Sequence, residues 1–102
     1  MLQLRPSCEH CNRALPPDAA DARICSFECT FCAECVNEVL LNVCPNCGGG
    51  FEARPIRPRR NWRGGNDVGH HPASTAVRHA PVDRDRHREF ATAISAIAPR
   101  DR

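Results

Sequence analysis

Membrane-spanning and secretory segments are both missing from this sequence. No apolar stretch reaches the roughly 18 residues that a membrane helix requires. Residues 1–7 contain no apolar run of the length found in secretory signal peptides. From these two absences we expect a soluble, cytoplasmic protein that has no membrane partner.

Signatures of catalysis are also missing. The chain has no arrangement of Ser, His and Asp typical of a nucleophilic triad, and no glycine-rich loop that would cradle a phosphate. The acidic side chains of the first half come without a predicted pocket that would shift their pKa values toward acid–base work. We therefore expect neither enzymatic activity nor a small-molecule substrate.

Cysteine is absent from the last 55 residues, and all eight cysteines lie within the first 47. Their spacing is Cys-x2-Cys-x13-Cys-x3-Cys-x2-Cys-x2-Cys-x8-Cys-x2-Cys. In a reducing compartment, close pairs of this kind favour metal sites over disulfides. A structural zinc ion takes four thiolates, so the count predicts two bound Zn²⁺ ions. The predicted ligands are Cys8, Cys11, Cys25, Cys29, Cys32, Cys35, Cys44 and Cys47.

Three partitions of these ligands fit the spacing. A sequential pairing assigns the first four cysteines to one ion and the last four to the other. A nested pairing puts the four central cysteines on one ion and the two outer pairs on the other. A cross-brace joins the first, second, fifth and sixth ligands, and leaves the other four for the second ion. We favour the cross-brace, because it closes one site between a knuckle and a helix start, as in a treble clef.

The sequence also leaves open whether the sites bind zinc or iron. The segment from Cys44 to Gly48 reads Cys-Pro-Asn-Cys-Gly and resembles the iron-binding knuckle of rubredoxin. Sites of four thiolates do not choose sharply between iron and zinc. An iron-binding redox protein is therefore an alternative to a structural zinc protein.

Residues 1–54 predict a small α+β domain around these sites. β-favouring residues at 23–26 and 30–31 predict a short hairpin. An apolar stripe at helical spacing predicts a helix over 33–41. Short extended segments or strands are expected at the two ends of the domain, over 1–6 and 51–54.

The second half of the chain lacks such a pattern. Residues 55–82 hold four prolines and scattered arginines, which predicts a basic and mostly disordered linker. Asp83 is expected to cap an amphipathic helix over 83–98, with Phe90, Ile94 and Ile97 on one face. A lone helix of this length is marginal in water, so it needs a partner surface.

Lysine is absent, and all fourteen cationic side chains are arginines. Residues 1–52 hold three arginines against seven acids, whereas residues 53–102 hold eleven arginines against five acids. Arginines interleaved with an aromatic residue can bind the phosphates and bases of nucleic acid. Regulatory nucleic-acid binding by the tail is therefore a second functional hypothesis. Its candidate residues are Arg54, Arg57, Arg59, Arg60, Trp62 and Arg63.

The ligand order and loop lengths resemble a RING domain that has cysteine in place of its usual histidine. The residues with which RING ligases contact a ubiquitin-conjugating enzyme do not match. Glu9 and His10 stand where an aliphatic residue is usual, and the predicted helix has no aromatic residue. Ligase activity is therefore not expected.

Residues between the ligands carry a more specific resemblance. The segments Met-Leu-x-Leu-Arg-Pro-x-Cys-Glu-x-Cys, Ala-Arg-Ile-Cys-Ser-Phe-Glu-Cys-Thr-Phe-Cys and Cys-Pro-Asn-Cys-Gly-Gly resemble a family of short bacterial cysteine-rich proteins. That family is catalogued as a domain of unknown function, and the resemblance covers residues 1 to about 60. It implies a bacterial, cytoplasmic, zinc-binding protein. The leading hypothesis is a non-enzymatic module that contacts another protein or its own tail.

Overall fold

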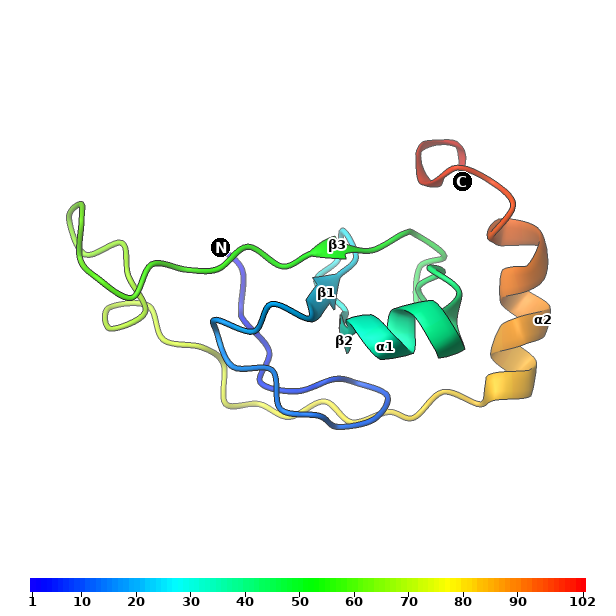
Figure 1. The fold of residues 1–102 in the computed structure, drawn as a ribbon, viewed down its shortest axis with the longest axis horizontal. Helices are drawn as coiled ribbons and strands as arrows, with labels where there is room; N and C mark the ends of the chain where they lie inside the picture. The colour runs from blue at the N-terminus through cyan, green and yellow to red at the C-terminus, as the bar shows by residue number, and fades with distance from the viewer.

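A short antiparallel hairpin lies at the centre of the computed structural model, which describes residues 1–102 (Figure 1). Strand β1 (Ala22–Ile24) pairs with β2 (Thr30–Cys32) on one side and with β3 (Glu52–Ala53) on the other. Arg23 lies opposite Phe31 on β2 and opposite Ala53 on β3. The hairpin and the closing strand predicted from the sequence are therefore both present.

Strand β2 leads directly into a helix of mixed type. One α-helical turn, α1 (Ala33–Cys35), continues as the π-helical segment η1 (Val36–Leu40). The backbone N–H of Leu41 caps the segment by donating to the carbonyl oxygen of Val36. Leu41 and Asn42 both have a φ of 56°, and this left-handed backbone ends the helix. The predicted helix is thus present, but it widens to π geometry after its first turn.

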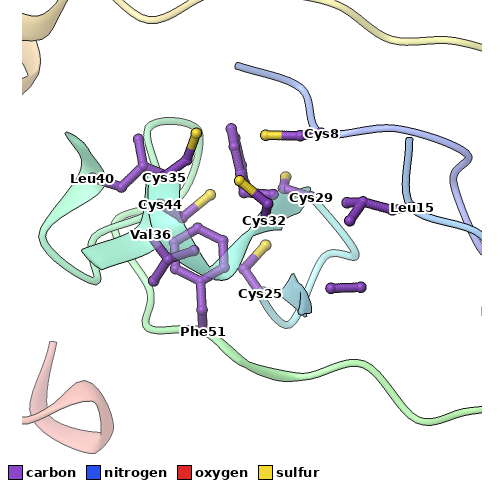
Figure 2. Close-up of a cluster of buried hydrophobic side chains, with 12 residues drawn as sticks. Cys8, Leu15, Cys25, Cys29, Cys32, Cys35, Val36, Leu40, Cys44 and Phe51 are labelled. Carbon is purple, nitrogen blue, oxygen red and sulfur yellow. The ribbon is translucent and has the colours of Figure 1, made fainter. Parts of the chain in front are cut away.

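The core is small and contains most of the cysteines. Figure 2 shows six buried cysteines gathered with Leu15, Val36, Leu40 and Phe51 in one cluster. The rings of Phe31 and Phe51 meet edge to face, with centroids 5.5 Å apart and an interplanar angle of 81°. A core of this size supplies little free energy of folding by apolar burial alone, and domains this small usually need a metal or disulfides.

The N-terminal segment differs from its prediction. No strand forms over residues 1–6, and the local pairing is a single bridge between Ser7 and Ala14. Leu4 has a φ of 55° and is 2% exposed. The chain therefore turns at Leu4 to bury its side chain, and this left-handed geometry is incompatible with a continuous strand.

Residues 55–82 contain no helix or strand. Figure 1 shows this segment looping out at one end of the molecule and then returning alongside the N-terminal residues. The backbone N–H of Ser74 donates to the carbonyl of Gln3 at 2.9 Å, and that of Ala80 to the carbonyl of Glu9 at 2.8 Å. The composition gave no sign of these bonds, because backbone partners supplied by the folded half cannot be seen in composition.

The C-terminal helix α2 (Arg84–Ile94) stands at the other end of the molecule, followed by the 3₁₀ turn η2 (Pro99–Asp101). Asp83 caps α2 as predicted, its carboxylate accepting from the N–H of Arg86 at 3.0 Å. The helix ends at Ile94, four residues before the predicted end. No helix in the structure combines the length and apolar character that crossing a membrane requires.

Helix α2 packs on η1 through a polar contact. His87 is 4% exposed, and its Nε2 lies 2.8 Å from the carbonyl oxygen of Leu40. Ala91, one turn later, is fully buried. The predicted face of Phe90, Ile94 and Ile97 lies beside the last cysteine knuckle, where Phe90 and Ile97 remain 46% and 42% exposed. The helix therefore docks mainly through His87 and Ala91.

Candidate metal centres

The first cysteine cluster contains four sulfur atoms that all lie within 4.8 Å of one another, from Cys8, Cys11, Cys32 and Cys35. The sulfurs of Cys11 and Cys32 are 3.8 Å apart. Four thiolates bound at about 2.3 Å around one tetrahedral ion would be separated by about 3.8 Å. A disulfide would require about 2.05 Å, and all eight cysteines are free. The first cluster thus has the dimensions of a four-thiolate metal site.

Two structural elements bring these sulfurs together. Cys8 and Cys11 lie on a tight turn, in which the N–H of Cys8 donates to the carbonyl of Arg13 at 2.9 Å. Cys32 ends β2 and Cys35 ends α1, so the strand-to-helix junction supplies the other two sulfurs. The carboxylate of Glu9 links the two elements by accepting from the backbone N–H of Thr30 at 2.6 Å.

The second cluster is less complete. The sulfurs of Cys25, Cys44 and Cys47 lie within 4.8 Å of one another, but that of Cys29 is not part of this group. The side-chain amide of Asn46 donates to the sulfur of Cys29 at 3.4 Å. Burial is the main cause that raises the pKa of the Cys44 thiol. Negative charge on Cys29 and Cys25 raises it further. Cys29 therefore contacts the knuckle that carries Cys44 and Cys47 through Asn46, although its sulfur lies outside the compact group.

Backbone N–H groups point at the sulfurs of the second cluster. The N–H of Phe27 donates to the sulfur of Cys25 at 3.4 Å, and that of Gly49 to the sulfur of Cys47 at 3.4 Å. The N–H of Asn46 donates to Cys44 at 3.5 Å. Gly48 has a φ of 78°, a conformation that glycine adopts without strain. These donors would stabilise negative charge on metal-bound sulfur.

Burial opposes ionisation of the cysteines when no cation is close. It is the main cause that raises the pKa of the Cys32 and Cys35 thiols above the ordinary value. Burial also acts to raise the pKa of Cys11, but hydrogen bonds from the Arg13 backbone and neighbouring thiols outweigh it and lower the pKa. A bound divalent cation would reverse this balance, because coordination favours thiolate over thiol.

The arrangement of the sulfurs corresponds to one of the three predicted partitions. The first, second, fifth and sixth cysteines form the first cluster, and the third, seventh and eighth form the second. This grouping is that of the cross-brace. The sequential and nested pairings do not fit, because each would join sulfurs that the structure places in different clusters.

Comparison with known proteins places this arrangement in a family. Residues 1–57, which include both clusters, match the family described as "Protein of unknown function (DUF1272)". The chain is 54% identical over 76 residues to the "Uncharacterized protein R02474" of Rhizobium meliloti (strain 1021). That alignment covers 74% of this chain and 83% of the relative. This chain belongs to that family. The resemblance seen between the ligands is thereby confirmed, while no solved structure matches the chain.

The arginines predicted to bind nucleic acid separate into two groups. Arg54 is 5% exposed, and its guanidinium donates to the carbonyls of Arg5 at 2.9 Å, Leu15 at 3.1 Å and Pro16 at 2.8 Å. Arg57 donates to the carbonyls of Leu2 and His71, both at 2.6 Å. Both side chains are committed within the fold, so neither offers its guanidinium to an external phosphate.

The other four candidates, Arg59, Arg60, Trp62 and Arg63, lie on the surface loop at the opposite end from α2. Trp62 is 71% exposed. These four lie within five consecutive residues of one exposed loop, whereas Arg54 is an internal brace.

Sequence reasoning missed three structural residues near the clusters. Glu9 is 2% exposed and also accepts from Arg5 at 2.8 Å. The four-residue spacing of this oppositely charged pair was the sequence signal that could have revealed it. His10 Nδ1 accepts from the N–H of Val82 at 2.9 Å, which holds the returning tail against the first knuckle. His87 had no sequence signal, because its partner is a backbone carbonyl in η1.

Proposed function

We propose that the chain is a non-enzymatic zinc protein of the cytoplasm, in which two Zn²⁺ ions stabilise a RING-like treble clef that contacts another protein. The observation that carries the proposal is the first cluster, where four sulfurs lie within 4.8 Å of one another. Four thiolates fill a tetrahedral zinc site and leave no position for substrate. Such a site is structural, which agrees with the small apolar core.

In the second site, Cys29 would complete the coordination of Cys25, Cys44 and Cys47. The side chain of Cys29 is held near the cluster by Asn46. Because Cys25 follows β1 and Cys29 precedes β2, the turn between the strands carries both residues. The proposed second site therefore requires this turn to move until the fourth thiolate reaches the ion.

Elemental analysis of the purified full-length chain tests the metal assignment. The expected result is two zinc ions per chain. Iron at these sites would contradict the zinc proposal and support the redox alternative, and a folded chain without metal would refute both. The chain is expressed in medium that contains both zinc and iron, so that the metal supply does not determine which ion is found.

Exposed apolar side chains beside the second cluster support the protein-contact role. Phe27 is 71% exposed, and it borders a groove of about 450 Å³ that Phe90, Ile94 and Ile97 also line. Apolar surface gathered in this way marks protein contact sites more often than scattered single residues do.

Cross-linking in cells tests this contact surface. The Phe27→Asp variant should lose a partner that the wild-type chain captures. Val77→Asp is the matched control, because Val77 is 62% exposed but does not line the groove. A partner retained equally by both variants would contradict the proposed surface.

A further inference from the structure

The surface loop over residues 58–68 is closed by its own hydrogen bonds. The N–H of Val68 donates to the carbonyl of Pro58 at 2.9 Å. Inside the loop, the side-chain oxygen of Asn61 accepts from the N–H of Gly65 at 2.8 Å. Gly64 and Gly65 adopt φ values of 54° and 82°, which let the chain reverse direction there. The loop therefore holds its shape without packing on the core.

The one acidic residue between positions 55 and 82 faces inward at the base of this loop. Asp67 is 3% exposed, and its carboxylate accepts from the backbone N–H of His70 at 2.9 Å. The ring Nδ1 of His70 lies 3.0 Å from the same oxygen. Asp67 therefore forms part of the loop's internal structure and does not pair with the arginines outside.

The loop presents three unpaired cations and one large aromatic ring. Arg59, Arg60 and Arg63 are exposed, and none forms a salt bridge in the structure. Trp62 lies between them in sequence and is 71% exposed, with no aromatic or cation–π partner. An exposed indole ring offers a flat apolar face for stacking and an N–H group that can donate a hydrogen bond.

We propose that loop 58–68 binds single-stranded nucleic acid. Trp62 stacks on an unpaired base, and Arg59, Arg60 and Arg63 contact the phosphates on either side. Base stacking on an aromatic ring with neighbouring arginines is the usual mode of single-strand binding. This activity goes beyond the proposed zinc role, because the loop contains none of the cysteines of the two clusters.

The composition of the loop favours this ligand over two others. Anchoring to an anionic membrane requires a larger apolar surface, whereas Trp62 is flanked in the loop by exposed Asn61 and Arg63. Duplex DNA is read by an element that enters a groove, and this loop contains no helix or strand. An unpaired base is the partner that uses both the exposed ring and the arginines.

Fluorescence anisotropy of a labelled short oligothymidylate, titrated with the full-length chain, tests the proposal. Three phosphate contacts predict a slope of about −2 when log K is plotted against log salt concentration. The emission of Trp62, the only tryptophan of the chain, should be quenched as the oligonucleotide binds. No binding at low salt, or binding without quenching, would overturn the proposal.

Variants assign the binding to the loop. The Trp62→Ala change should weaken binding roughly five- to 150-fold, since one stacked base contributes about 1–3 kcal/mol and about 1.36 kcal/mol corresponds to ten-fold. The triple change of Arg59, Arg60 and Arg63 to Ala should abolish detectable binding. The matched control changes Arg86, Arg88 and Arg100 to Ala, which removes the same charge from the exposed surface around α2. The affinity of this control for the oligonucleotide should fall less than about two-fold. Equal losses of affinity in the two triple variants would contradict the loop as the binding site.

Competing ligands complete the test. Duplex of the same length and vesicles of phosphatidylcholine with phosphatidylglycerol are titrated with the same chain. We expect the chain to bind the single strand most tightly, and the duplex and the vesicles at least several-fold more weakly. Tighter binding to the duplex or to the vesicles would overturn the proposal. Each variant must retain the wild-type metal content and circular dichroism, which the distance of the loop from the clusters predicts.

Discussion

The two cysteine clusters use the same chemistry but differ in how far the fold arranges their ligands. In the first cluster, four sulfurs lie within 4.8 Å of one another, whereas the second has three and leaves Cys29 outside. The first knuckle is braced by Glu9 and Arg54, which bond to backbone groups in distant segments. The second knuckle is contacted by α2 and by the guanidinium of Arg102, which donates to the carbonyls of Asn42 at 2.8 Å and Gly48 at 3.2 Å. Its residue Asn46 also bonds to the sulfur of Cys29. A site whose ligands are already in place loses less entropy when it binds an ion, so the first should bind metal more tightly.

Metal removal should have the largest effect. Apparent binding free energies for structural zinc are about 10–16 kcal/mol in finger peptides, far more than a core this small provides. We expect a chelator to remove the second ion first and then to unfold residues 1–54 as the first ion leaves. Release of zinc to a colorimetric chelator, followed together with circular dichroism, measures both steps. A fold that survives complete metal removal, or simultaneous loss of both ions, would contradict the comparison.

Single ligand substitutions should separate the clusters directly. Cys32→Ser removes a ligand that is 1% exposed, at the junction of β2 and α1, and it should leave the domain largely unfolded. Cys47→Ser removes an exposed ligand of the second cluster and should leave a folded chain with one tightly bound ion. Metal content per chain and thermal unfolding measure the difference. Equal damage from the two substitutions would show that the sites depend on one another.

Arg54→Ala tests the brace behind the first knuckle. It leaves the carbonyls of Arg5, Leu15 and Pro16 without their donor, which should lower the free energy of unfolding by about 3 kcal/mol. Urea unfolding of the zinc-loaded chain measures this loss. Arg60→Ala is the matched control: it removes an exposed arginine and should change stability by less than about 0.5 kcal/mol. Similar values for both would mean that Arg54 does not act as a brace.

Asn46→Ala should have the smallest effect, confined to the second cluster. It removes the amide that donates to the sulfur of Cys29 at 3.4 Å. We expect a loss of about 1 kcal/mol, seen as several-fold faster zinc release from the second site. Release from the first site should keep its wild-type rate, which serves as the internal control. Faster release from both sites would place Asn46 in a role shared by the whole domain.

Local sequence signals predicted the elements whose partners are near in the chain. The hairpin β1–β2 closes over a short turn at Glu28, where φ is 65°, and β-favouring residues on both sides were sufficient to place it. Asp83 was identified as a helix cap because its partner is three residues away. The extended segment over 1–6 was less well predicted, because the turn at Leu4 depends on the core that buries this side chain.

The sequence did not reveal which side chains contact distant segments of the chain. Arg54 and Arg60 look alike in an arginine-rich stretch, and only the fold shows that Arg54 is buried against carbonyls 38 to 49 residues earlier in the chain. His87 gave no signal either, since its partner is the carbonyl of Leu40. Any residue can supply a backbone carbonyl, so no pairing of residue types reveals such a bond in advance.

The sequence by itself identified the eight cysteines as candidate metal ligands, because thiolate chemistry and the spacing of Cys-x2-Cys pairs are local properties. It also favoured the cross-brace, but spacing alone left the sequential and nested pairings open. Only the tertiary structure decided between them, since the hairpin places Cys32 and Cys35 beside the first knuckle and Cys25 beside the last. It also decided which arginines are buried braces and which surround Trp62 on the surface loop. Both outcomes depend on contacts between distant segments, which form only when the chain has folded.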